Sequence, residues 1–370
     1  MTAQTLDGFL LTRNWRDAPE GIELEFWFST AQGPLCALVR GEHSVFFLAE
    51  SALPRAQVLL GDTAGLEIRP VKLRDFALSP VVGLYFRHYR QARKAADTLR
   101  AHGLDPLEAD INPADRYLME RFVAGSARLH GTVRRRGKCM LLEDPAVKAS
   151  VYRPALKVVS FDIETAMEGL QLYSIAAHGV SAAGEERQVF MLGAGAQQPF
   201  VVTCATQEDV LQAFQDWIVE YDPDVLIGWN VVNFDTRYLQ RVADHLGRRL
   251  LLGRERRPGH WREQDEDGER YTVQFPGRVI LDGIELLRAA FYRFASFSLE
   301  HVANTLLGDG KLLHGAGRGG EITRQFLEDK IGLAADLLTD GELVSDSRAT
   351  TAMLDFAVAR SATAKSAIQK

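Results

Sequence analysis

The segment of residues 157–165 constrains the fold more than any other feature, because it joins an apolar run to two closely spaced carboxylates. Apart from its acids it is mostly apolar or β-branched, which predicts a buried strand. Asp162 and Glu164 are two positions apart, so their side chains leave the same face of that strand. Unpaired like charges at the end of a buried strand are poorly solvated and repel each other. The pattern favours a divalent cation here, although Asp-x-Glu alone is more often a solvated strand face or a turn.

The length and composition describe an ordinary globular chain. With 370 residues, of which 46% are hydrophobic and 25% charged, the sequence predicts two or three domains with their own cores. The net charge is −6, and the acidic surplus lies in residues 151–370. This charge argues against strong nonspecific nucleic-acid binding by the whole molecule, but it does not exclude a local groove.

Cysteine usage and the N-terminal sequence indicate the cellular compartment of the chain. Cys36, Cys139 and Cys204 are far apart and lack the spacing of a disulfide framework or a zinc site. The N-terminus has neither the basic region nor the apolar core of a signal peptide, and no apolar run approaches the length of a membrane span. We therefore expect a cytoplasmic protein without a membrane partner.

The first part of the chain combines β-like and helical patterns. Residues 9–50 alternate short apolar runs with turn residues, which predicts an antiparallel β unit. Residues 83–102 predict a helix that ends at a glycine and carries Arg87, Arg90 and Lys94 on one stripe. That stripe is either a solvated helix face or a contact for a nucleic-acid backbone. Acidic and proline residues then interrupt the pattern just before the central strand, which suggests a domain boundary.

The elements after the central strand predict a meander followed by a crossover. Residues 171–177 and 188–192 are expected to form two further strands, residues 208–221 an amphipathic helix, and residues 225–227 a short strand. Gly228 turns the chain towards another helical pattern.

A second polar group follows that short strand. Asp235 is expected at or near the N-terminus of the next helix, where it could be an ordinary N-cap. Asn230 lies five residues earlier, at the mouth of the same strand–helix turn. The amide and the carboxylate together favour a functional site over a simple cap.

These residues carry a resemblance to a known family. Asp162-Ile-Glu164 followed by Asn230-x-x-x-Phe234-Asp235 resembles the first two motifs of the 3′→5′ proofreading exonuclease of family B DNA polymerases. The similarity extends from residue 8 to about residue 344. Further stretches that carry it are residues 11–17, 116–122, 221–232, 277–285 and 297–302.

The resemblance implies an α/β fold with a specific organisation. A ribonuclease-H-like exonuclease domain, a mixed sheet flanked by helices, would occupy residues 151–345. A smaller mixed α+β N-terminal domain would precede it in residues 1–150, and residues 346–370 would be a C-terminal tail. The palm motifs DxxSLYP and DTD of the family do not occur in the sequence, so we expect the N-terminal portion of such a polymerase, truncated before the palm.

The resemblance also assigns residues to the site. The catalytic, metal-binding carboxylates would be Asp162, Glu164, Asp235 and Asp340, with Asn230 and Phe234 near the single-stranded 3′ end. All-oxygen ligands suit Mg²⁺ or Mn²⁺, and two ions can generate a hydroxide and stabilise the leaving oxygen. Asp282 could be taken for another ligand, but the match makes it a structural position beside the site.

The third motif of the family departs from its pattern. In the family it is Tyr-x-x-x-Asp on a helix. Here Asp340 fits the acid, but Asp336 stands where the tyrosine is expected. A further negative charge should repel hydroxide and substrate, unless Asp336 serves as a base or an extra ligand.

Two functions follow from these patterns. The first is a metal-dependent 3′→5′ exonuclease that hydrolyses single-stranded DNA ends, the proofreading part of a family B DNA polymerase. The alternative is a catalytically impaired remnant that still binds DNA. The expected partner is the primer 3′ end, together with replication or repair proteins of the parent polymerase, and the chain is expected to be a monomer.

Overall fold

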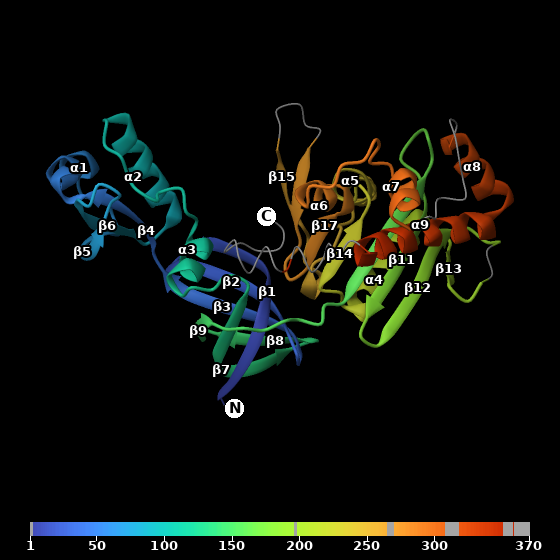
Figure 1. The fold of residues 1–370 in the computed structure, drawn as a ribbon, viewed down its shortest axis with the longest axis horizontal. Helices are drawn as coiled ribbons and strands as arrows, with labels where there is room; N and C mark the ends of the chain where they lie inside the picture. The colour runs from blue at the N-terminus through green and yellow to red at the C-terminus, as the bar shows by residue number, and fades with distance from the viewer. Residues whose placement is uncertain (1–2, 196–197, 265–269, 308–317, 351–357, 359–370) are drawn as a thin grey trace. The chain divides into compact units, whose positions relative to one another are not determined.

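The computed structural model describes residues 3–195, 198–264, 270–307, 318–350 and 358 (Figure 1). These residues form two compact units, which meet in the sequence between Arg153 and Pro154. Each unit is described by itself. Most of the predicted tail, residues 346–370, lies outside the described residues, and the last long helix continues through Val344 to Thr350.

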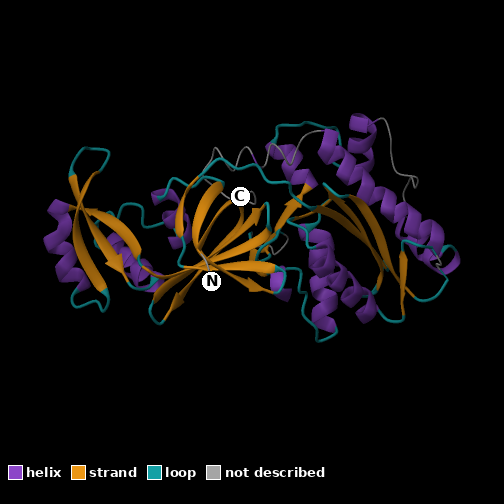
Figure 2. Ribbon diagram, turned by 90° about the horizontal axis from the view of Figure 1, so that it is seen from below, coloured by secondary structure: helices purple, strands orange, loops and turns teal. Residues whose placement is uncertain are grey.

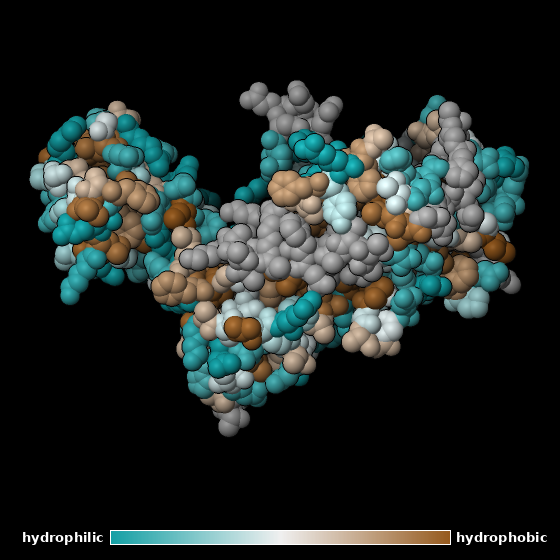
Figure 3. Space-filling view, viewed as in Figure 1, coloured by the Kyte–Doolittle hydropathy of each residue, from teal (hydrophilic) through white to brown (hydrophobic). Residues whose placement is uncertain are grey.

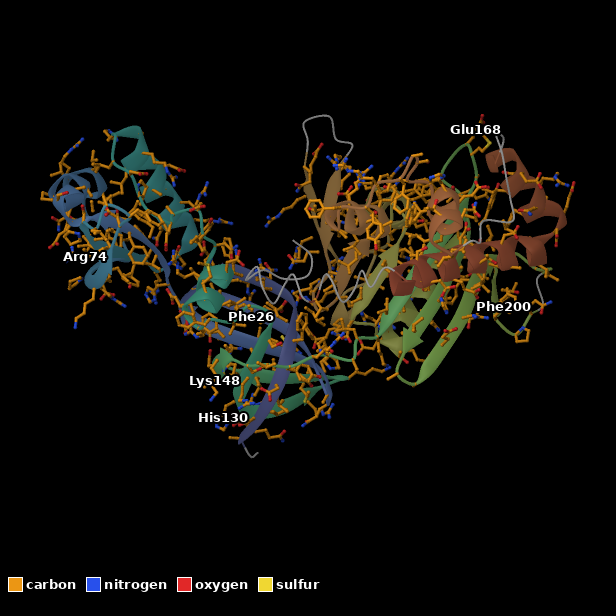
Figure 4. All side chains as sticks on the ribbon, viewed as in Figure 1. Phe26, Arg74, His130, Lys148, Glu168 and Phe200 are labelled. Carbon is orange, nitrogen blue, oxygen red and sulfur yellow. The ribbon has the colours of Figure 1, made fainter. Side chains whose placement is uncertain are left out.

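Six strands of the first unit form one sheet in the order β1-β2-β3-β8-β7-β9, and β1 also pairs with β7. This additional pairing closes five of the strands into a ring. The strands are β1 (Ala3–Ala18), β2 (Gly21–Thr30), β3 (Gly33–Glu42), β7 (Ser126–Arg136), β8 (Cys139–Glu143) and β9 (Ala146–Ala149). Helix α3 (Pro113–Glu120) packs into the same core, where Tyr117 stacks on Phe26 with ring centroids 5.4 Å apart (Figure 4). The predicted antiparallel β unit is thus observed over β1 to β3.

A three-stranded sheet completes the first unit, with helices along one side (Figure 2). Its elements are β4 (Ser44–Ala49), a 3-10 turn (Glu50–Ala52), α1 (Leu53–Leu60), β5 (Leu66–Arg74), β6 (Pro80–Phe86) and α2 (Tyr89–Ala101). The prediction of a helix over residues 83–102 was therefore wrong at its start. Leu84 and Phe86 belong to a strand, because pairing with β4 and β5 buries them completely beneath the helices. Arg87 consequently lies outside α2.

The second unit is built on a mixed sheet in the order β13-β12-β11-β10-β14-β17. The strands are β10 (Val158–Thr165), β11 (Leu172–Ser181), β12 (Gly184–Leu192), β13 (Val201–Cys204), β14 (Val225–Gly228) and β17 (Val279–Asp282). The predicted central strand and the two strands after it form an antiparallel meander, and β14 runs parallel to β10. The central strand thus lies between an antiparallel and a parallel neighbour.

Helices cover both faces of this sheet, as Figure 1 shows. On one face Val159 and Phe161 of β10 pack with α4 (Gln207–Tyr221) and α5 (Arg237–His245). On the other face lie α8 (Arg318–Glu328) and α9 (Lys330–Thr350). Because side chains alternate along a strand, Asp162 and Glu164 project from the face that α9 covers.

The remaining elements lie beyond β14 in the sequence. They are a π-helical turn (Val232–Thr236), a 3-10 turn (Arg254–Arg256), β15 (His260–Glu263), β16 (Tyr271–Gln274), α6 (Gly283–Ala289) and α7 (Leu299–Leu307). Strands β15 and β16 pair as a separate antiparallel two-stranded sheet.

A buried charge network fixes the start of β14. Arg254 and Arg278 are each only 2% exposed. Arg254 Nη2 lies 2.8 Å from Asp224 Oδ1, and Arg278 Nη2 lies 2.8 Å from Asp222 Oδ1. Burial raises the pKa of Asp222, but the two guanidinium charges outweigh it and hold that pKa below its usual value. Asp222 and Asp224 therefore each have an arginine side chain beside them.

The surface in Figure 3 is mostly hydrophilic, with hydrophobic residues scattered among the polar ones. Over the described ranges, none of the helices has both the length and the apolar character needed to cross a membrane.

Candidate active site

Asp162 lies near the carboxyl end of β10, opposite Ala176 of β11. Its side chain is half-buried, and its Oδ1 accepts a hydrogen bond of 3.0 Å from the backbone N–H of Ile163. The strand therefore holds this carboxylate on the face beneath α9.

Asp235 reaches the same place from the π-helical turn after β14. Gly228 makes this possible, because a Cβ there would lie 2.8 Å from Phe161 O of the neighbouring strand. The turn is closed by a hydrogen bond of 2.8 Å from Thr236 N to Val231 O, which spans five residues instead of four. Asp235 thus lies near the start of the helical segment, as predicted, but its side chain caps no helix and is fully buried.

The two carboxylates lie close together, Asp235 fully buried and Asp162 half-buried. Asp235 is fully buried, and neither of its carboxylate oxygens accepts a hydrogen bond of good geometry from the described residues. Burial first, and then the nearby charge of Asp162, raise the pKa of Asp235 well above its usual value. A cation between the two groups would remove both costs, and carboxylate oxygens are the ligands that Mg²⁺ and Mn²⁺ prefer. The pair therefore fits a divalent metal ion.

Glu164 and Asp340 lie nearby but do not complete a cluster. Both are buried, with exposed fractions of 9% and 5%. Glu164 follows Asp162 on β10, and Asp340 lies on α9, which packs against that strand. However, in the part of the chain that the structure describes, no three acidic, histidine or cysteine side chains converge closely enough to hold one ion. The structure thus joins Asp162 with Asp235 and leaves the other two acids outside a common ligand set.

Asn230 and Phe234 flank the buried aspartate on the surface. Asn230 is exposed and has a φ of +58°, a left-handed conformation that asparagine tolerates better than most residues. Phe234 is 47% exposed, and its ring centroid lies 6.4 Å from that of Tyr238. An exposed amide and an exposed aromatic ring therefore lie one helical turn apart beside Asp235.

Asp336 has a partner that the sequence did not suggest. Gln325 Nε2 of α8 donates a hydrogen bond of 3.1 Å to Asp336 Oδ2. This contact fixes the orientation of the amide, and it leaves Gln325 Oε1 buried and without a partner among the described residues. Only the spacing of Asp336 from Asp340 was visible in the sequence, since α8 is a separate helix.

Asp282 serves as a helix cap. It ends β17 opposite Gly228, and its Oδ1 accepts a hydrogen bond of 2.9 Å from Ile284 N at the start of α6. Burial raises its pKa. Its carboxylate is therefore engaged in local structure at the same edge of the sheet.

Comparison with protein families places three matches along the chain. Residues 8–42 match the model described as DNA polymerase II, N-terminal, and residues 44–104 match DNA polymerase II, insertion domain. Residues 108–302, more than half of the chain, match DNA polymerase family B, exonuclease domain. The last match includes Asp162, Asn230 and Asp235.

Individual proteins give the same result. The chain is 40% identical over 359 residues to DNA polymerase II of Escherichia coli, covering 95% of this chain and 45% of that protein. It is 27% identical over 271 residues to a DNA polymerase of Thermococcus gorgonarius, covering 71% and 31%. The solved structure of the family B DNA polymerase of Pyrobaculum calidifontis superposes with a TM-score of 0.74 at 21% identity, covering 98% and 48%. The chain thus spans less than half the length of each of these relatives. The last comparison concerns the fold alone.

Proposed function

Because this chain belongs to the family B DNA polymerases, with an exonuclease domain of that family, we propose that it hydrolyses single-stranded DNA from the 3′ end in a metal-dependent reaction. It would thereby supply the proofreading activity of a DNA polymerase. The observation that carries this proposal is the fully buried Asp235 facing the half-buried Asp162, with no lysine or arginine of the described residues paired to either. The mixed sheet with helices on both faces supports a ribonuclease-H-like arrangement.

The four acids of the site suggest which side chains would hold each metal ion. Asp162 and Asp235 would hold a divalent ion, Mg²⁺ or Mn²⁺, and Glu164 and Asp340 would contribute to a second. When bound, two such ions supply an activated hydroxide and stabilise the leaving 3′ oxygen.

Substrate positioning would come from the two exposed side chains. Phe234 offers a ring face on which the terminal base can stack, and the amide of Asn230 can donate to its sugar or phosphate. Neither contact depends on base identity, which suits an enzyme that removes any terminal nucleotide. Single-strand binding should weaken steeply with salt, because backbone charge would dominate it.

Asp336 supports a second candidate function, DNA binding without efficient hydrolysis. Its negative charge lies one helical turn before Asp340, and Gln325 holds it in place. If that charge repels the substrate phosphate, the chain would bind DNA without efficient hydrolysis.

A gel assay tests the proposal. Purified protein with Mn²⁺ or Mg²⁺ should shorten a 5′-labelled single strand from its 3′ end, and Asp162→Ala should abolish this. Glu186→Ala, which changes an exposed acid of β12, is the matched control and should retain activity. Equal rates for Asp162→Ala and the parent would show that the nuclease is a contaminant.

A further inference from the structure

The segment after α6 has a helix end that local folding rules do not explain. Phe291 N donates to Arg288 O, and Tyr292 N donates to Leu287 O, each at 3.0 Å. This pair of hydrogen bonds is the Schellman motif, whose left-handed position is usually glycine. Here the position is Phe291, with a φ of +63°.

Burial does not compensate for this conformation. Phe291 is 89% exposed, so its ring gains almost no contact with the protein. A bulky residue with positive φ is a genuine backbone outlier, and such outliers gather at functional sites. A glycine would serve folding better, but Phe122 ends α3 in the same way, so a role for the Phe291 ring is argued from the residues around it.

Neighbouring residues make the position suitable for a nucleic acid. Tyr292 is 36% exposed, and its ring is nearly parallel to that of Phe294, at 3° and 5.9 Å. Arg293 is exposed and forms no ion pair with any residue of the described ranges. Two accessible aromatic rings beside an available cation match the combination that binds single strands, stacking for bases and positive charge for phosphates.

A hydrogen bond anchors the segment of residues 291–297 beside the candidate active site. Trp229 Nε1 donates a hydrogen bond of 2.8 Å to Phe297 O, at the far end of the same segment. Trp229 directly precedes Asn230, and its ring lies against Gly283 at the start of α6, where an added Cβ would meet it at 2.9 Å. The aromatic segment and the turn that presents Asp235 are therefore held by one tryptophan.

We propose that Phe291, Tyr292 and Arg293 form a stacking platform for single-stranded DNA, which takes nucleotides on the 5′ side of the terminal nucleotide. This inference rests on the proposed function, since it assumes that the 3′ terminus lies at Asp162 and Asp235. The platform recognises any base, because it offers ring faces and one positive charge but no directed pattern of hydrogen bonds.

The test separates stability from binding. Phe291→Gly should weaken binding of fluorescein-labelled (dT)10 by about tenfold to a hundredfold, the effect of losing one stacked base. The same change should raise the melting temperature by about 1 to 3 °C, because glycine suits the left-handed position. Binding is measured by fluorescence anisotropy in EDTA at low salt. Phe291→Trp should retain affinity, since it keeps a ring at this position.

Phe76→Ala is the matched control, because Phe76 is a fully exposed phenylalanine of the other unit. Unchanged affinity of Phe291→Gly, an equal loss in Phe76→Ala, or no binding of (dT)10 by the parent would each overturn the platform. Because EDTA prevents hydrolysis, binding that depends on Phe291 supports the platform even if the gel assay shows no nuclease. Nuclease activity with unchanged affinity in Phe291→Gly would refute the platform alone.

Discussion

Replacing Asp235 by asparagine should stabilise the metal-free protein. The pKa of this carboxyl is raised by burial and by Asp162, so the folded state favours the protonated form. For each pH unit by which the folded pKa lies above the ordinary value of about 3.9, this burial costs about 1.36 kcal/mol. The asparagine amide avoids this cost but leaves its own polar atoms poorly paired, which costs about 1 to 3 kcal/mol. We expect a net gain of about 1 to 3 kcal/mol.

The measurement is thermal unfolding of Asp235→Asn and the parent in EDTA and in Mn²⁺. For a unit of about 200 residues the gain corresponds to about 2 to 7 °C in EDTA. The gain should grow as the pH rises from about 4 towards the raised pKa. Below about pH 4 an aspartate is protonated in both states, so only the cost of the amide is left and the variant should be the less stable protein. Mn²⁺ at a hundred times its dissociation constant should add about 2.7 kcal/mol to the parent and little to the variant.

The control is Asp244→Asn, an exposed acid on α5, which should change neither melting temperature nor its response to Mn²⁺. A variant that is less stable than the parent in EDTA at pH 7 would refute the argument that the buried carboxyl is a net cost. An equal Mn²⁺ response in both proteins would place the ion elsewhere.

Two further predictions concern α9 and the start of β14. Asp336→Tyr should raise the single-turnover exonuclease rate by about tenfold to a thousandfold, because it replaces a charge with a neutral hydroxyl near the reacting phosphate. If Asp336→Tyr gives no gain in rate and Asp340→Ala gives no loss, α9 is not part of the site. Arg278→Met should destabilise the protein by about 3 to 5 kcal/mol in urea unfolding, because it leaves Asp222 buried beside one guanidinium instead of two. Because the pKa of Asp222 is lowered, its contribution to stability is present above about pH 4 and is lost as the pH falls through the folded pKa. Asp222→Asn should flatten this acid limb of the unfolding profile, and an unchanged limb would assign it to other acids.

Strong periodicity made parts of the fold predictable. The central strand, the meander and the helix of residues 207–221 have clear apolar patterns, and the structure has all of them. The helix expected over residues 83–102 failed at its start, because Leu84 and Phe86 also fit a two-residue period and only pairing with β4 and β5 decides between them. Tertiary context overrides local pattern at such boundaries.

The candidate site was less predictable in its geometry than in its residues. Asp235 was expected at or near a helix N-terminus, and it lies two residues before α5. A π-helical turn is not visible as a sequence pattern, so the complete burial of its side chain could not be foreseen. Gln325 and Phe291 carry no motif. Gln325 matters because it contacts Asp336 on another helix, and Phe291 matters because of its backbone conformation. Both features arise only in the folded chain.

The two ends of the short strand β14 differ in how the charge of their acids is balanced. Before it, Asp224 is buried and Asp222 partly buried, and Arg254 contacts both of them through charged hydrogen bonds. After it, Asp235 is buried more completely and faces Asp162, yet no lysine or arginine among the described residues pairs with either. The sequence thus supplies a permanent cation where the charge serves folding. At the other end no lysine or arginine of the described residues offsets the same electrostatic cost, which fits the divalent cation that we propose for this site.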